Sequence, residues 1–305
     1  MYDSIIILGP TATGKTGVSI KLAHALNTEI INADSMYIYK QLNIGTAKPT
    51  IEEMDNVKHH LIDIVNPDES FNVAEYRVLA KNTLFDFFEN KKIPIIVGGT
   101  GFYIDSLISN YSYGNAEKNI DLRNELENFA MTNGNESLYK KLCDLSPDVA
   151  SKYHYNDKKR VIRAIELLMS NNSDFANYET PLLKNPLIIG LNFPREILYD
   201  RINKRVDIMV NNGLIDEVKE LYQLGYLPDK YQAMKGIGYK EIFDYLDNKC
   251  SLVDAIDKIK QHTRNYAKRQ ITWFKRNDKI HWFNMSDYYN LDGVINDILD
   301  IYYTK

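Results

Sequence analysis

The feature that most constrains this chain is a glycine-rich loop, GPTATGKT, which matches the pattern G-x-x-x-x-G-K-[ST]. The loop follows a β-branched run, Ser4–Leu8, and precedes Gly17–Leu26, whose apolar residues have helical spacing. In such a strand–loop–helix unit, backbone N–H groups turn towards phosphate oxygens and the helix N-terminus adds positive potential. The pattern therefore predicts a site for a diphosphate or a triphosphate.

Two side chains of this loop have a predicted chemical task. Lys15 supplies a point charge to the terminal phosphates, and the hydroxyl of Thr16 is placed to ligate Mg²⁺. The alternative is a glycine-rich turn that binds nothing, which eight residues in the right context disfavour. The predicted diphosphate- or nucleotide-binding residues are Gly9, Pro10, Thr11, Ala12, Thr13, Gly14, Lys15 and Thr16.

Strand-like and helix-like segments alternate after the loop, which predicts an α/β domain with a parallel sheet. We expect strands at Glu29–Ala33, His60–Val65 and Ile93–Val97, and a helix at Val73–Phe88. Together with the phosphate loop, this order is typical of a P-loop NTPase-like core.

The pattern then changes from alternating to helical. A polar stretch, YSYGNAEKN, is followed by helical spacing at Asp121–Met131, Ser137–Leu145 and Asp157–Met169. A turn-rich connector follows, and a buried strand returns at Leu187–Phe193. This order predicts a helical insertion in the α/β core.

We place the helical insertion at residues 111–185 and the core at residues 1–110 and 186–305. The C-terminal part of the core is expected to be mostly helical. Arg195–Asn212 carries an apolar stripe, and Ser251, three residues before an Asp, predicts a capping box that opens a long helix.

The charge balance, the cysteines and the lengths of the apolar runs limit which partners and which compartment the protein can have. The chain has 37 Lys and Arg against 41 Asp and Glu, a net charge of −4, so nucleic-acid binding would need basic residues gathered locally. Cys143 and Cys250 are too far apart to suggest a disulfide framework and lack zinc-ligand spacing. The apolar run near the start is too short for a signal peptide, and no stretch approaches the roughly 20 apolar residues of a membrane span. We therefore expect a cytoplasmic protein with no membrane contact and no obligatory protein partner.

Asp34 is a candidate catalytic residue because of its place after a strand. It follows Glu29–Ala33, and ligands of open parallel sheets bind beyond the carboxyl ends of the strands, where the phosphate loop also lies. A carboxylate there would reach a nucleophile close to the phosphates. The alternative role is an N-cap or an Asx-turn, which is common for an Asp before Ser.

Further stretches resemble, in the same order, the motifs of bacterial tRNA dimethylallyltransferases, also called tRNA isopentenyltransferases. They are ADSMYIYKQLNIGTAKP (33–49), HHLIDI (59–64), VGGTGFY (97–103), NDKKRVIRAIEL (156–167), GYKE (238–241) and YAKRQITWFKR (266–276). These matches span nearly the whole chain and are far more specific than the phosphate loop alone.

The resemblance implies an enzyme that transfers a dimethylallyl group from dimethylallyl diphosphate to N6 of the adenosine on the 3′ side of the anticodon in tRNA. It implies that the phosphate loop and Mg²⁺ hold the donor's diphosphate, although such loops are often described as nucleotide sites. Asp34 matches the carboxylate that takes the proton from N6, and Thr100 matches a threonine that lines the channel. Arg205 resembles the arginine that reaches the diphosphate.

The same resemblance implies tRNA contacts from the helical insertion and from the C-terminal helix. Basic residues gather in both segments, and aromatic residues are interleaved with them in the second. The alternative is a solvated basic helix face with its aromatic residues in the core. The implied tRNA-binding residues are Asp34, Ser35, Met36, Tyr37, Thr100, Arg123, Lys158, Lys159, Arg160, Arg163, Lys268 and Arg269.

One position departs from the family pattern. Glutamine usually stands at the fourth position of the D-S-x-Q stretch, where this chain has Tyr37. A phenol can stack and make one or two hydrogen bonds, but it lacks the paired donor and acceptor of an amide. The departure puts in question how Tyr37 acts, and not which reaction the resemblance implies.

Two other classes fit parts of the sequence. A small-molecule kinase would share the phosphate loop, the α/β core and Asp34, with residues 111–185 as a lid over the substrate. That class leaves the basic C-terminal helix and the GGTG element without a purpose. An RNA-binding switch driven by nucleotide would show nucleotide-dependent RNA affinity and no prenyl transfer.

Overall fold

The computed structural model describes residues 2–110, 119–170 and 180–304 of the chain. These residues form two compact units, one made of Met1–Ser109 with Pro181–Lys305 and the other of Asn110–Thr180. We call the first unit the core and the second the helical insertion. Most of the predicted polar loop and of the connector, residues 111–118 and 171–179, lies outside the described residues.

The boundary at which the core resumes differs from the expected one. Leu183 is buried in the core, and the N–H groups of Leu182 and Leu183 both donate to the carbonyl oxygen of Leu107, at 2.8 and 3.1 Å. The core therefore resumes at Pro181 rather than at residue 186, because the end of the connector already packs against it.

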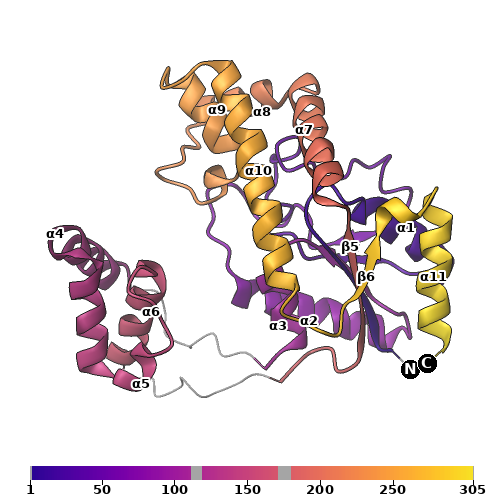
Figure 1. The fold of residues 1–305 in the computed structure, drawn as a ribbon, viewed down its shortest axis with the longest axis horizontal. Coiled ribbons are helices and arrows are strands. Elements are labelled where there is room, and N and C mark those ends of the chain that lie inside the picture. The colour runs from indigo at the N-terminus through magenta and orange to yellow at the C-terminus, as the bar shows by residue number, and fades with distance from the viewer. Residues whose placement is uncertain (1, 111–118, 171–179, 305) are drawn as a thin grey trace. The chain divides into compact units, whose positions relative to one another are not determined.

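The core is built on a parallel sheet, whose strand order among the described residues is β3-β2-β4-β1-β5-β6 (Figure 1). The strands are β1 Ser4–Leu8, β2 Ile30–Asn32, β3 His59–His60, β4 Ile95–Gly98, β5 Pro186–Asn192 and β6 His281–Asn284. All neighbouring strands run parallel, which confirms the predicted α/β class. Because β1 lies between β4 and β5, the phosphate loop emerges near the middle of the sheet.

The observed strands differ from the predicted ones in two places. The expected strand His60–Val65 is wrong beyond its first residue, because Leu61 and Asp63 have φ angles of 61° and 56°, which an extended strand does not allow. Val65 only forms an isolated bridge with Tyr39. Strand β6, a four-residue edge strand that pairs with β5, was not among the predicted strands.

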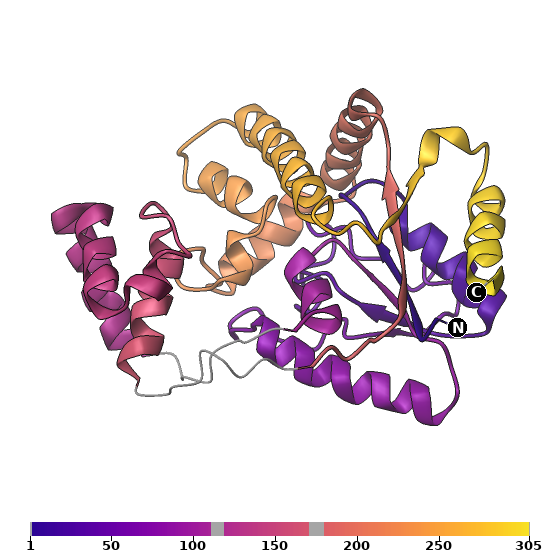
Figure 2. The ribbon, with the colours of Figure 1, turned by 60° about the horizontal axis from the view of Figure 1, so that its bottom comes forward.

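Helices cover both faces of the sheet, and both faces are apolar. Along β1, Ile5 and Ile7 belong to one hydrophobic cluster, whereas Ile6 and Leu8 belong to another. Helices α1 (Lys15–Leu26) and α11 (Leu291–Thr304) pack in the first cluster, and α2 (Val73–Glu89) and α3 (Gly101–Ile108) in the second (Figures 1 and 2). Burial on both sides explains why the strands are continuous apolar runs.

Helices that follow β5 complete the core. They are α7 Arg195–Asn211, α8 Leu214–Gln223, α9 Tyr239–Leu246 and α10 Leu252–Phe274, with the 3₁₀ helices η2 Ala233–Lys235 and η3 Met285–Asp287. The predicted capping box of α10 is present, since the N–H of Asp254 donates to Ser251 Oγ at 3.1 Å and the N–H of Ser251 donates to Asp254 Oδ2 at 3.3 Å.

The helical insertion contains α4 Ile120–Leu145, α5 Pro147–Ala150 and α6 Lys158–Met169 around its own apolar cluster. Helix α4 is broken at Gly134, which has non-helical angles of φ 83° and ψ 161°. This break separates the two helices predicted for the segment. Within the described ranges, no helix has the length and apolar character needed to cross a bilayer.

Candidate active site

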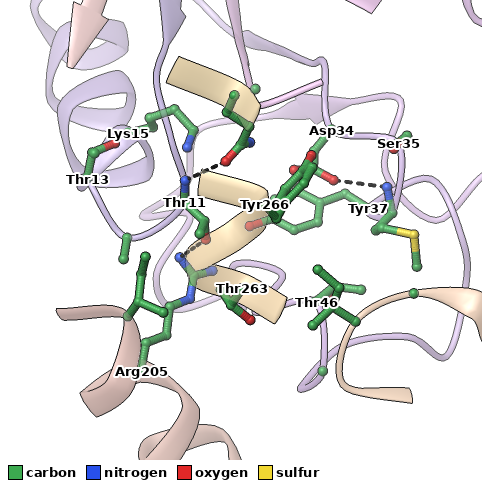
Figure 3. Close-up of a pocket in the computed structure, with 18 of the residues that line it drawn as sticks. Thr11, Thr13, Lys15, Asp34, Ser35, Tyr37, Thr46, Arg205, Thr263 and Tyr266 are labelled. Carbon is green, nitrogen blue, oxygen red and sulfur yellow. Dashed lines mark hydrogen bonds between the residues drawn. The ribbon is translucent and has the colours of Figure 1, made fainter. Parts of the chain in front are cut away.

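A cavity of about 400 Å³ lies in the core where the loops after β1 and β2 meet α7 and α10 (Figure 3). Its polar lining includes Thr11, Lys15, Thr16, Asp34, Ser35, Tyr37, Arg205, Tyr266, Arg269 and Gln270. Its apolar lining includes Met36, Ile202, Val206, Met209, Ile237 and Ile259. The cavity thus combines cations, one carboxylate and an apolar wall at the carboxyl end of the sheet, where ligands of such folds bind.

The first position of the phosphate loop, Gly9, lies so close to strand β5 that no side chain fits there. Gly9 has a φ of 149°, and a Cβ there would lie 2.3 Å from the carbonyl oxygen of Leu191 on β5. Thr13 is buried, and its hydroxyl donates to the carbonyl oxygen of Pro10 at 2.9 Å. Gly9 therefore shapes the loop without lining the cavity, whereas residues 11–16 line it.

Lys15 is a partly buried cation that lines the cavity. Its Nζ donates to the carbonyl oxygens of Gly9 and Pro10 at 3.1 and 2.9 Å. Burial, and to a smaller extent the nearby Arg205, lowers the pKa of Lys15 to about 8, although the Asp34 carboxylate partly opposes the shift. An anionic ligand would stabilise the charged form of this side chain.

Asp34 forms the predicted Asx-turn and also lines the cavity. The N–H of Met36 donates to Asp34 Oδ1 at 2.9 Å, as a dashed line in Figure 3 shows. Asn32 holds the backbone from the other side, because its Oδ1 accepts from the Asp34 N–H at 2.9 Å and its Nδ2 donates to the Asp34 carbonyl at 3.0 Å. Among the described residues, none hydrogen-bonds to Asp34 Oδ2. The turn therefore orients the carboxylate and leaves one oxygen for a ligand.

Thr100 acts on this region indirectly. Its Oγ1 accepts from the N–H of Ser35 at 3.0 Å and donates to Ser35 Oγ at 3.2 Å, and Ser35 lines the cavity where Thr100 does not. The two loops can approach because β4 ends in Gly98, where a Cβ would lie 2.1 Å from the Ala33 carbonyl oxygen. Thr100 thus supports the loop that carries Asp34.

Arg205 reaches the phosphate loop from α7. Its Nη1 donates to Thr11 Oγ1 at 3.4 Å and its Nη2 to the carbonyl oxygen of Ala47 at 3.3 Å. One helical turn earlier, Arg201 Nε donates to the carbonyl oxygen of Ala12 at 2.8 Å. Sequence reasoning missed Arg201, although its place four residues before Arg205 puts both side chains on one face of the helix.

Tyr37 uses its hydroxyl within the protein. The phenol donates to the carbonyl oxygen of Ala47 at 2.8 Å, the same atom that Arg205 contacts. Burial raises the pKa of Tyr37 to about 12, and the nearby Arg205 partly opposes the shift. The hydroxyl therefore stays protonated, and the ring contributes a surface to the cavity wall.

A carboxylate that the sequence did not single out shapes another wall of the cavity. Glu217 on α8 accepts from the N–H groups of Asn43, Ile44 and Gly45 at 2.9, 2.7 and 3.0 Å, and from the Tyr239 hydroxyl at 2.6 Å. Gly45 lines the cavity. The tyrosine of the GYKE stretch thus helps to hold a loop beside the site.

Helix α10 presents different side chains to solvent, cavity and core. Lys268 and Arg269 are exposed, and the Arg269 guanidinium lies 5.7 Å from the ring centre of Tyr266, which lines the cavity. Trp273 Nε1 donates to Asp105 Oδ2 at 3.0 Å, and Phe274 is buried. The core role proposed for aromatic residues of this helix is therefore correct for Phe274.

In the helical insertion, the basic residues predicted to bind tRNA fall into two groups. Lys159 and Arg160 at the start of α6 are exposed, and Lys158 is partly exposed beside them. Arg123 and Arg163, in contrast, both contact the buried carboxylate of Glu166, at 2.6 and 2.5 Å. The structure thus gives these two arginines an internal role that their charge alone did not reveal.

Glu166 is expected to stabilise the helical insertion as a carboxylate. Burial alone would raise its pKa, but hydrogen bonds from Arg123, Arg163 and the Asn119 N–H outweigh burial and lower the pKa to about 2. A lowered pKa means that the stabilisation is complete above the unfolded-state pKa of about 4.3 and is lost as the pH falls towards 2.

Glu166→Gln should therefore lower the free energy of unfolding of the insertion by roughly 2–3 kcal/mol, less than for a fully buried pair because the arginines reach solvent. Hydrogen exchange of α4 and α6 at neutral pH measures the effect. Glu127→Gln, which changes an exposed carboxylate of α4, should leave protection unchanged. Equal protection in the two variants would contradict a stabilising role for Glu166.

Metal-binding clusters are absent from the part of the chain that the structure describes: no three His, Cys, Asp or Glu residues lie together. Magnesium commonly needs no such cluster, because it keeps waters and takes phosphate oxygens as ligands. Thr16 and Asp34, which line the same cavity, are oxygen donors of the type that suits Mg²⁺. The residues present therefore fit a cation held largely by a bound diphosphate.

Several known proteins are similar to this chain. The family model described as IPP transferase matches residues 37–277. The chain is 50% identical over 300 residues to the tRNA dimethylallyltransferase of Alkaliphilus oremlandii, covering 97% of this chain and 95% of that protein. Among solved structures, it resembles the tRNA isopentenylpyrophosphate transferase of Bacillus halodurans, with 44% identity, a TM-score of 0.74 and coverage of 99% and 95%. It also resembles a eukaryotic dimethylallyltransferase acting on tRNA, with 28% identity, a TM-score of 0.81 and coverage of 100% and 80%.

Proposed function

This chain belongs to the IPP transferase family, and from that premise we propose that it transfers a dimethylallyl group from dimethylallyl diphosphate to N6 of the adenosine 3′ of the anticodon in tRNA. Diphosphate is released in this reaction. The observation that supports the proposal is a single cavity that is lined both by positively charged side chains and by a carboxylate. Lys15 and Arg205 supply positive charge at the phosphate loop, and Asp34 offers a carboxylate oxygen in the same cavity.

The cations suit the bond that breaks. As the allylic carbon–oxygen bond cleaves, negative charge grows on the diphosphate oxygens, and fixed positive groups stabilise it. Lys15 and Arg205 would contact these oxygens, and Thr16 would help to hold Mg²⁺, which supplies further positive charge when bound. The partly buried setting of Lys15 strengthens its attraction for the diphosphate.

The carboxylate and the apolar wall suit the bond that forms. N6 attacks the prenyl carbon and loses a proton, which Asp34 Oδ2 would accept. Met36, Val206 and Met209 would surround the prenyl fragment and exclude water that could otherwise capture it. The adenine would leave the base stack to enter the cavity, as base-modifying enzymes generally require.

Labelled dimethylallyl diphosphate, Mg²⁺ and bulk tRNA test the proposal directly. We expect labelled N6-dimethylallyladenosine after nucleoside analysis, competition by inorganic diphosphate, and neither a requirement for ATP nor its hydrolysis. Stoichiometric ADP formation with a small-molecule acceptor would instead establish a kinase. The comparisons give no support to that alternative.

The helical insertion should contribute to tRNA binding through its exposed cations. Changing both Lys159 and Arg160 to Ala should weaken tRNA binding and reduce the slope of log affinity against log salt by about one unit per lost phosphate contact. Binding of dimethylallyl diphosphate should be nearly unchanged. Titrations at several salt concentrations measure the slope.

Lys81→Ala provides the control, because Lys81 is an exposed lysine on α2 in the core. It should leave the affinity for tRNA and its salt dependence unchanged. If the double variant binds tRNA like the control at every salt concentration, these two residues do not belong to the interface.

A further inference from the structure

Gln270 on α10 joins two loops of the active site through its side-chain amide. Its Oε1 accepts from the N–H of Thr11 in the phosphate loop at 3.0 Å, and its Nε2 donates to the carbonyl oxygen of Gly99 at 2.9 Å. The side chain is buried, with the residue 5% exposed. A Cβ on Gly99 would lie 2.3 Å from Nε2, so the loop after β4 lies directly against the amide.

This contact suits an amide and no charged group. An amide side chain offers an uncharged acceptor and an uncharged donor on one planar group, so Gln270 satisfies an N–H and a C=O at once. A buried group that lost either partner would carry an uncompensated cost of about 1–3 kcal/mol. The contact is also long-range, because Gln270 lies far along the chain from both loops.

The two loops that Gln270 joins hold the two ends of the proposed reaction. The first is the phosphate loop, which would hold the diphosphate. The second leads to Thr100, whose hydroxyl accepts from the N–H of Ser35, next to Asp34. The distance between the leaving group and the proton acceptor thus depends on the spacing of these loops.

We propose that Gln270 is a positioning residue that sets this spacing and thereby aligns the prenyl donor with the attacking amine. The inference rests on the proposed function. It differs from a purely structural role for Gln270, which would stabilise the fold without changing the alignment in folded enzyme.

Two substitutions separate these roles. Gln270→Met keeps the length of the side chain and removes both hydrogen bonds. Gln270→Glu keeps the acceptor for Thr11, but as a carboxylate it faces the Gly99 carbonyl oxygen with a second oxygen. Protonation of that carboxyl restores a donor, so acid should return the Glu variant towards the wild-type arrangement. Burial raises the pKa of such a carboxyl above its ordinary value of about 4.3.

Single-turnover prenyl transfer at saturating tRNA and donor is the main measurement. We expect Gln270→Met to be slower than wild type by about tenfold to a hundredfold at every pH from 6 to 8, the cost of a small misalignment. Gln270→Glu should be equally slow at pH 8 and should recover to within about threefold of wild type at pH 6. If Gln270→Glu at pH 6 is faster than Gln270→Met, the restored hydrogen bond accounts for the gain in rate, because both side chains are then uncharged.

Ionisable groups near Gln270 also affect the rate, and the comparison of each variant with wild type at the same pH controls for them. Lys15, Asp34, Arg205, Tyr266 and Arg269 line the same cavity as Gln270. They are present in all three proteins, so the pH dependence that all three proteins share is removed when each variant rate is divided by the wild-type rate at the same pH. A wild-type rate for Gln270→Met would overturn the inference and assign any effect of Gln270→Glu to its charge.

Hydrogen exchange gives a readout that needs no activity. Gln270→Met should speed exchange in both loops, residues 9–16 and 98–101, while Gln270→Glu at pH 8 should do so mainly in the second. Unchanged exchange in both loops would overturn the inference. Absence of transfer by the wild-type protein would refute the proposed function instead, and a loss of activity that merely follows the unfolded fraction would show that Gln270 is only structural.

Discussion

Asp34→Asn is expected to lower the single-turnover rate of prenyl transfer at least about a hundredfold. Adenine N6 is a poor nucleophile because its lone pair is delocalised into the ring, and loss of its proton relieves the positive charge that builds up on nitrogen. A positioned base commonly contributes ~10²–10⁴-fold, and Asn cannot take the proton. Affinities for tRNA and donor should change much less, because the lost interaction belongs mainly to the transition state.

The structure makes this variant informative. An Asn at position 34 can still accept from the Met36 N–H through its own Oδ1, so the Asx-turn is retained. Asp68→Asn, a change of an exposed carboxylate, serves as the control and should be fully active. Near-normal turnover by Asp34→Asn, with an unchanged circular dichroism spectrum, would show that Asp34 only forms the turn.

Lys15→Ala is expected to reduce kcat/KM for dimethylallyl diphosphate roughly a hundredfold, the usual effect of removing one group that stabilises developing negative charge. Binding of tRNA should change little. Steady-state kinetics at saturating tRNA measure the loss. Lys21→Ala, on the solvent side of the same helix, is the matched control, because Lys21 pairs with Asp292 and does not line the cavity.

The effect of Lys15→Ala on diphosphate affinity should also depend on pH. Since the pKa of Lys15 is lowered to about 8, the free protein loses this positive charge as the pH rises through 8. The ratio of wild-type to Lys15→Ala affinity for inorganic diphosphate should therefore be largest below pH 7 and decline above pH 8. Ionisation of diphosphate itself cancels in the ratio. A ratio that stays constant from pH 6.5 to 9.5 would contradict the assignment of Lys15 as a diphosphate ligand.

Elements with a strong local pattern were predictable from the sequence. The apolar run of β1, the capping box of α10 and the glycine that breaks α4 each encode their structure in adjacent residues. The segment after His60 was not predictable, because its backbone depends on a distant contact: Asn32 Nδ2 donates to the Leu61 carbonyl oxygen at 2.9 Å. Strand β6 has only Phe283 buried among its four residues, too short a pattern to indicate a strand.

The residues of the candidate site also differ in how far the sequence could identify them. Lys15, Asp34 and Arg205 were identified because their charges belong to recognisable motifs, and the structure brings them to one cavity. Glu217 and Gln270 were missed, since both act on backbone groups that only the folded chain brings near them. Their residue types are common, and nothing in the surrounding sequence marks the contact.

The strand order has a consequence for the order in which the chain folds during synthesis. Strand β1 pairs with β5, so Ser4–Leu8 cannot complete its pairing until Pro186–Asn192 has left the ribosome. The helical insertion lies between these strands and has contacts that are local in sequence, which favours rapid folding. The other neighbour of β1, β4 (Ile95–Gly98), precedes the insertion in the chain, so only one edge of β1 stays unpaired while the insertion is synthesised. An unpaired strand edge promotes aggregation, so rapid folding of the insertion shortens the time for which this edge is exposed.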